Sequence, residues 1–167
     1  ATGSASQTAQ LYAAFSDPAA AHTWRERPGT WRWQRALVYV PSATVAALGA
    51  NEYLTLGGFY ASANPGTYGW YLRLTQDGAL LVVGTPIAGS PETFRAYGTF
   101  PVNQWVELEL GLHSQQGDGV KRAFAFVVNG SFYGWYRQGR MDNETYDRAA
   151  LGILNTNSPD SLSVYID

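Results

Sequence analysis

The sequence contains no cysteine, a single lysine at Lys121 and few charges of either sign. Only 14% of the 167 residues are charged, and the formal net charge is -2. Without cysteine, disulfide bonds and thiolate metal sites are excluded. Without a basic field the chain has nothing with which to collect a polyphosphate, so we expect no nucleic-acid partner. No stretch approaches the roughly 20 apolar residues that span a bilayer, so we expect no membrane insertion.

Aromatic residues, glycine and proline are abundant instead. The chain has 6 Trp, 11 Tyr, 7 Phe, 18 Gly and 8 Pro. Aromatic residues fit a pleated sheet surface, while Gly and Pro form its turns, so the composition indicates an all-β chain. A chain of this length buries a sufficient core without cross-links. We expect a tail or linker over residues 1–10 and a single domain over residues 11–167.

Alternation with a two-residue period predicts the main strands. In residues 31–40, Trp31, Trp33 and Arg35 share one face with Leu37 and Tyr39. In residues 105–112, the even positions are apolar and must face a core, which leaves Trp105, Glu107 and Glu109 on the opposite side. Further strands are predicted over residues 53–60, 69–75, 79–83, 122–128, 132–136, 151–154 and 161–167, with a short helix over residues 43–48.

Two dipeptides predict tight hairpin turns, namely Asp77-Gly78 and Asn129-Gly130. Neighbouring strands are therefore joined directly, and no helical crossover separates them. We predict a two-layer antiparallel β-sandwich.

Three segments carry a resemblance to a known superfamily. Residues 100–105 open a strand at Trp105, residues 124–130 form a strand that ends in Asn129-Gly130, and residues 162–167 form a last strand that ends in an acid. This order resembles the concanavalin A-like, laminin-G-like jelly rolls, a superfamily of lectins, carbohydrate-binding modules, glucanases and polysaccharide lyases. The resemblance implies two stacked, curved sheets with a ligand on the concave sheet or at its rim.

Large rings and planar polar groups share several predicted strands. A sugar ring offers an apolar face of C–H bonds and a rim of hydroxyls, which match an aromatic plane flanked by planar donors and acceptors. Because buried Arg must be paired, a face that mixes Arg with rings is not all core. We therefore predict a glycan-binding surface that includes Trp31, Trp33, Arg35, Trp70, Arg73, Trp135 and Tyr136.

Two acids on one strand face raise the alternative of a glycosidase. Such enzymes need two carboxyls about 5 Å apart for retention and further apart for inversion. Glu107 and Glu109 lie two apart, which separates them by roughly 7 Å along a strand. Related glucanases space three acids along one strand, and the third is missing here. We interpret these acids as a solvated or Arg-paired face.

A polysaccharide lyase is the second enzymatic alternative. It needs a neutralised uronate carboxyl and a Tyr or His near the ring proton. Residues 132–138 resemble the aromatic-Gly-Tyr-x-Gln strand of some lyases, but the Gln-x-His and Arg-rich strands of that family are not matched. We expect His113 in a loop just beyond a core strand. The candidate set is Tyr136, His113, Arg35 and Gln34.

A calcium site and an extracellular address complete the expectations. The resemblance implies that the first and last strands lie side by side, with a structural Ca²⁺ that clips them. Asp17 and Asp167 are the hard oxygen ligands that this ion prefers. We expect a module of a larger extracellular or cell-surface protein, with a filament or surface-layer subunit as the alternative from another class.

Overall fold

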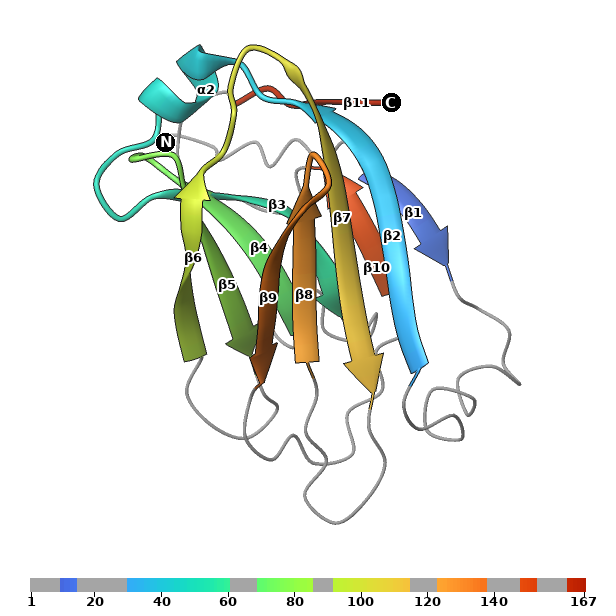
Figure 1. Ribbon diagram of the computed structural model, residues 1–167. Coiled ribbons are helices and arrows are strands. Elements are labelled where there is room, and N and C mark those ends of the chain that lie inside the picture. The colour runs from blue at the N-terminus through green and yellow to red at the C-terminus, as the bar shows by residue number, and fades with distance from the viewer. Residues whose placement is uncertain are drawn as a thin grey trace, which may run out of the picture.

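The computed structural model describes residues 10–14, 30–60, 69–85, 92–114, 123–137, 148–152 and 162–167. These residues form two antiparallel sheets that pack face to face, with one short helix at an end of the sandwich (Figure 1). The predicted β-sandwich is therefore confirmed. Among the described residues, no helix is long and apolar enough to cross a membrane.

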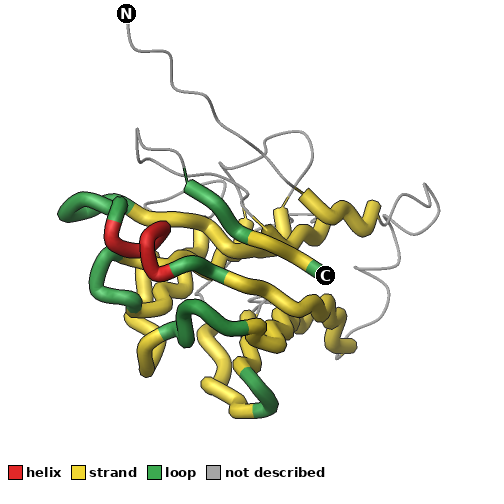
Figure 2. Tube along the Cα trace, turned by 90° about the horizontal axis from the view of Figure 1, so that it is seen from above, coloured by secondary structure: helices red, strands yellow, loops and turns green. Residues whose placement is uncertain are grey.

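The six-stranded sheet has the order β1-β10-β3-β4-β5-β6 and the five-stranded sheet the order β11-β2-β7-β8-β9. Figure 2 shows the short helix at the same end of the sandwich as the C-terminal segment. The bounds are β1 Gln10–Ala14, β2 Thr30–Tyr39, α2 Ser42–Ala46, β3 Tyr53–Tyr60, β4 Gly69–Thr75, β5 Ala79–Thr85, β6 Glu92–Thr99, β7 Trp105–Ser114, β8 Ala123–Val128, β9 Ser131–Arg137, β10 Arg148–Gly152 and β11 Tyr165–Ile166.

The alternation expected for β2 and β7 holds along both strands. On β7 the even residues Val106 to Leu112 are completely buried, and on β2 Val38 is buried while Trp33 and Leu37 are exposed. The two strands pair residue by residue from Thr30 opposite Ser114 to Tyr39 opposite Trp105. Because paired residues point to the same side of a sheet, one face of the five-stranded sheet is core and the other meets solvent.

Trp70 is in the core, which corrects its assignment to a binding surface. Its side chain is completely buried, and its ring stacks on Phe124 of the opposite sheet, with centroids 5.9 Å apart and planes at 5°. Phe59 packs edge-on against the same phenyl ring at 6.3 Å. The reason is period: Trp70, Leu72 and Leu74 share one face of β4, and that face is entirely buried.

The hairpin turn at Asn129-Gly130 has the backbone that its sequence predicts. Both residues have positive φ, 49° and 76°, as a type I′ turn requires. The Asn129 side chain also accepts a hydrogen bond of 2.9 Å from the backbone N–H of Glu107. The turn at Asp77-Gly78 is confirmed as well, since it joins the paired strands β4 and β5.

Strands β1 and β6 were not predicted, and the terminal strands are arranged differently from the expectation. β1 pairs with β10, whereas β11 pairs with β2 in the other sheet. The expectation that the first and last strands lie side by side is therefore wrong. β6 is an edge strand of mixed polar and apolar residues, so it needs no regular alternation.

We predict that Asn129→Gly lowers the free energy of unfolding by about 1 kcal/mol, because it keeps the turn but removes the acceptor for Glu107. Gly130→Ala should cost a similar amount through backbone strain alone, since nothing lies within 4 Å of the added Cβ. Urea denaturation measures both. Equal stability of all three proteins would contradict the turn's role.

We predict that Trp70→Ala destabilises the fold by about 3–5 kcal/mol, because it leaves a cavity between the sheets. Trp70→Phe should cost less, since it keeps a ring and removes an indole N–H that has no partner in the described part of the chain. Trp33→Ala, which removes an exposed ring, serves as the matched control and should change stability little. A small effect at Trp70 in denaturant titrations would show that this ring is not core.

Candidate functional site

The outer side of the five-stranded sheet carries exposed hydrophobic side chains, which we call the aromatic face. Five large hydrophobic residues are exposed within the described residues, and all of them lie on this side. Their exposed fractions reach 50% for Trp105 and 57% for Phe132. The members of the aromatic face are Trp33, Leu37, Trp105, Phe132 and Tyr165.

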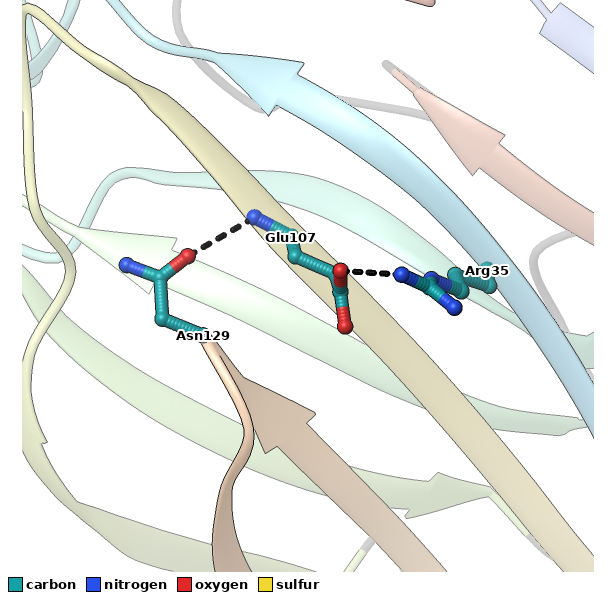
Figure 3. A network of polar contacts seen from close by, with 3 residues as sticks. All are labelled: Arg35, Glu107 and Asn129. Carbon is teal, nitrogen blue, oxygen red and sulfur yellow. Dashed lines mark hydrogen bonds and ion pairs between the residues drawn. The ribbon is translucent and has the colours of Figure 1, made fainter.

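An ion pair lies between the rings of the aromatic face. The guanidinium of Arg35 on β2 binds the carboxylate of Glu107 on β7, whose backbone is held by Asn129 (Figure 3). The Arg35 side chain is 65% exposed, so the pair contributes little to stability. The expectation of an Arg-paired acid is confirmed for Glu107. Glu109 lies directly opposite Arg35 in the register and is partly buried.

Trp33 rests on a glycine of the neighbouring strand. A Cβ at Gly111, which pairs with Trp33, would lie 2.7 to 2.8 Å from three carbons of its six-membered ring. Only glycine therefore lets the indole lie down over β7. Ala125 of β8 pairs with Gly111 and is completely buried.

Gln34 points to the opposite side of the sheet from Arg35, so these two members of the predicted lyase set do not lie together. Its amide donates hydrogen bonds to the carbonyls of Gly58 at 3.2 Å and Ala150 at 3.1 Å, both on the other sheet. Gln34 thus ties the two layers together from within, and it cannot act beside Arg35. His113 lies inside β7 and is partly buried, so its expected position in a loop is wrong.

For three other predicted binding residues the structure describes the backbone alone. The backbone of Trp31 pairs with His113, that of Trp135 with Ala125 and that of Tyr136 with Phe124. Their side chains are not described, so their role in binding stays a prediction.

The calcium site also stays a prediction. Asp17 lies outside the described residues, while Asp167 is exposed and its backbone pairs with Leu37. The described residues contain no group of three or more His, Cys, Asp or Glu side chains suited to a metal. Melting temperatures in calcium and in chelator would test the site.

A pocket of about 500 Å³ opens on the outer side of the six-stranded sheet. Its floor comes from the ends of β3 and β4 and from β5 and β6, and its wall from the segment before β3 and the β4–β5 turn. We call it the Arg73 pocket. Its lining is Ala50, Asn51, Glu52, Tyr53, Arg73, Thr75, Gln76, Asp77, Ala79, Leu81, Val83 and Thr93.

Arg73 is the main cation of this lining and lies over an aromatic ring. Its guanidinium carbon is 3.8 Å from the centroid of Tyr53. Burial lowers the pKa of Arg73, while the nearby Tyr53 and Tyr71 act in the opposite direction. Its Nε is buried without a hydrogen-bond partner, and no carboxylate of the described residues pairs with it. A half-buried cation without a counter-ion is costly in an apolar setting, and an anion bound there would relieve that cost.

The two acids of the lining already take part in local turns. The Glu52 carboxylate accepts a hydrogen bond of 2.8 Å from the Gly49 N–H. Asp77 accepts from the Thr75 hydroxyl and from the Ala79 N–H, which closes the β4–β5 turn. These contacts hold the carboxylates at the wall of the pocket instead of against Arg73.

Sequence reasoning identified Arg73 but missed the pocket around it. Nothing in the local sequence around Asn51, Tyr53 or Thr93 indicates that these residues line one pocket. The missing information was register, since β3 pairs with β4 and β5 with β6 to assemble this surface. The sequence did indicate that Arg73 points outward, because Arg73 lies between the apolar residues Leu72 and Leu74, which point inward.

No protein-family model and no curated protein matches this sequence. Among solved structures, the fold is similar to an endo-beta-1,4-glucuronan lyase from the fungus Trichoderma reesei, with a TM-score of 0.60 and 11% identity. That likeness covers 90% of this chain but 64% of the lyase, so the chain spans less than two thirds of it. The fold is also similar to the Caenorhabditis elegans galectin LEC-6, with a TM-score of 0.50 and 14% identity over 97% of this chain and 93% of the galectin. The chain therefore shares the jelly-roll fold of these two proteins, which is the fold that the resemblance of its sequence implied.

Proposed function

We propose that this chain is a carbohydrate-binding module that holds an acidic saccharide in the Arg73 pocket. The observation that carries this proposal is the half-buried guanidinium of Arg73, stacked on Tyr53 and without a carboxylate partner in the described part of the chain. A guanidinium presents a planar fork that binds a carboxylate through two parallel hydrogen bonds. A uronic acid offers that group on a sugar ring.

The size and lining of the pocket suit a sugar. A volume of about 500 Å³ is within the range of small-molecule sites. Leu81 and Val83 give the lining an apolar part, against which C–H bonds can pack. Asn51, Gln76 and Thr93 add groups of the kind that bind hydroxyls.

The structural neighbours are compatible with this assignment. One is named as a lyase of glucuronan, a polymer of an acidic sugar, and the other as a galectin. At such low identity the similarity shows a shared fold and does not show a shared ligand, because one fold hosts many functions. The charge and burial of Arg73 therefore support the acidic saccharide independently of these names.

We also place the module outside the cell, as part of a larger protein. Polymeric acidic glycans are extracellular materials, and a recognition domain acts where its ligand is. Secretion of the full-length protein from its native cells, followed with an antibody, tests this assignment. Retention inside the cells would contradict it.

We predict that Arg73→Gln weakens binding of acidic oligosaccharides roughly tenfold to a hundredfold, because a charge-assisted contact is lost. Arg73→Lys should recover only part of the affinity, since lysine keeps the charge but not the planar fork. Isothermal titration with oligomers of glucuronate, galacturonate and mannuronate measures the effect. Neutral oligomers of the same length are the ligand control.

The matched control variant is Arg35→Gln, which removes an exposed arginine on the other sheet that is already paired with Glu107. It should leave the binding of acidic oligomers unchanged. Unaltered affinity in Arg73→Gln, or no affinity of the native protein for any acidic oligomer, would refute the proposal. An unsaturated product in the same mixtures, detected by ultraviolet absorbance, would show that the pocket is a lyase site instead of a binding site.

A further inference from the structure

The aromatic face lies on the sheet opposite the Arg73 pocket and takes no part in the site proposed above. Its five members account for all the large hydrophobic side chains that are exposed among the described residues. Apolar residues exposed singly need no explanation, but these five share one side of one sheet, and that side is open to a ligand. None of the five belongs to the buried core.

The rings are spread along the sheet instead of forming one apolar centre. Trp33 and Trp105 are six register positions apart on the paired strands β2 and β7, which corresponds to roughly 20 Å. At the far end, Tyr39 packs against Trp105 at 5.6 Å and against Tyr165 at 5.9 Å. An elongated ligand can therefore contact a ring at each end of this strip.

The surface between Trp33 and Trp105 holds the exposed apolar side chain of Leu37 beside three charged residues. Arg35 is paired with Glu107 at its middle, and Glu109 lies beside them. A protein partner would bury this ion pair at the centre of an interface, where charges are depleted and their desolvation is costly. An acidic polymer would meet two carboxylates for one guanidinium. A neutral sugar chain satisfies the pair with hydroxyls and stacks its C–H faces on the rings.

Trp33 lies over the neighbouring strand and keeps part of its ring exposed. Gly111 lets the indole lie over β7, where a Cβ would collide with the ring, and Ala125 of β8 is completely buried beside Gly111. The 43% of Trp33 that is exposed is the surface on which a ligand can stack.

We propose that the aromatic face is a second glycan-binding site, which takes a neutral polysaccharide chain laid along β2 and β7. It differs from the Arg73 pocket in position, shape and ligand charge. Trp33 and Trp105 are the stacking residues, and Arg35 and Glu107 bind the hydroxyls between them.

The test uses cellohexaose, xylohexaose and mannohexaose as soluble probes, with microcrystalline cellulose and chitin as insoluble ones. Native protein should bind at least one of them, with a change in tryptophan fluorescence. Trp33→Ala and Trp105→Ala should each weaken that binding about threefold to tenfold, while Trp33→Phe keeps a ring and most of the affinity. Gly111→Ala should weaken it as well, because the added Cβ displaces the Trp33 ring that remains present.

Arg73→Gln separates the two sites. It should leave the neutral probes bound as before, just as Trp33→Ala should leave acidic oligomers bound. Melting temperatures confirm that each variant is folded. Binding of no neutral probe by the native protein overturns the inference, and so does full binding by the Trp33→Ala, Trp105→Ala double variant. Concentration-dependent self-association that Trp33→Ala abolishes, measured by sedimentation velocity, would assign the face to a second copy and overturn the inference too.

Discussion

The stack of Trp70 on Phe124 joins the two sheets, and the outer surfaces follow from it. Once Trp70 points inward from β4, the two-residue period sends Leu72 and Leu74 inward and Arg73 outward. The same rule on β8 turns Phe124 inward and leaves Ala125 on the outer side. A core contact therefore decides that Arg73 faces the outer side of the six-stranded sheet. It also decides that the small Ala125 faces the outer side of the five-stranded sheet, where it is itself completely buried.

Neighbouring residues on β2 show how strictly the pleat separates structural from functional chemistry. Gln34 donates to Gly58 and Ala150 between the layers, while Arg35, one residue later, binds Glu107 in solvent. Both side chains are planar donors, yet only Arg35 can meet a ligand on the aromatic face. Arg35 and Arg73 also differ, because Glu107 neutralises Arg35 whereas Arg73 is half buried with no carboxylate partner among the described residues. That difference is why we assign ligands of different charge to the two surfaces.

Local sequence patterns predicted the features that depend on a single strand or turn. The features that depend on pairing between distant strands could not be predicted in this way. The buried residues of β7 and the turn at Asn129-Gly130 were predicted correctly, because both depend on neighbouring residues. Alternating apolar residues predict the strand, and residue types that accept positive φ predict the turn. The prediction for Trp70 was wrong, although its two-residue spacing from Leu72 places both side chains on the same face of β4. The prediction rested on the affinity of aromatic rings for sugars and gave too little weight to that spacing. The Arg73 pocket could not be predicted, since Tyr53 reaches Arg73 only through the register of β3 on β4. β6 was missed because an edge strand with polar residues lacks the alternation that identifies a strand.

The placement of the two surfaces on opposite sides of one core limits how they can act together. Close-packed side chains fill the space between the sheets, so a short oligosaccharide at Arg73 cannot also touch Trp33. Simultaneous occupation then requires either one long polymer that wraps the sandwich or two separate polymers. Only the first raises affinity through effective concentration, while the second cross-links its ligands. Because the surfaces favour different charges, an acidic and a neutral polymer would occupy different sides, and the geometry favours cross-linking.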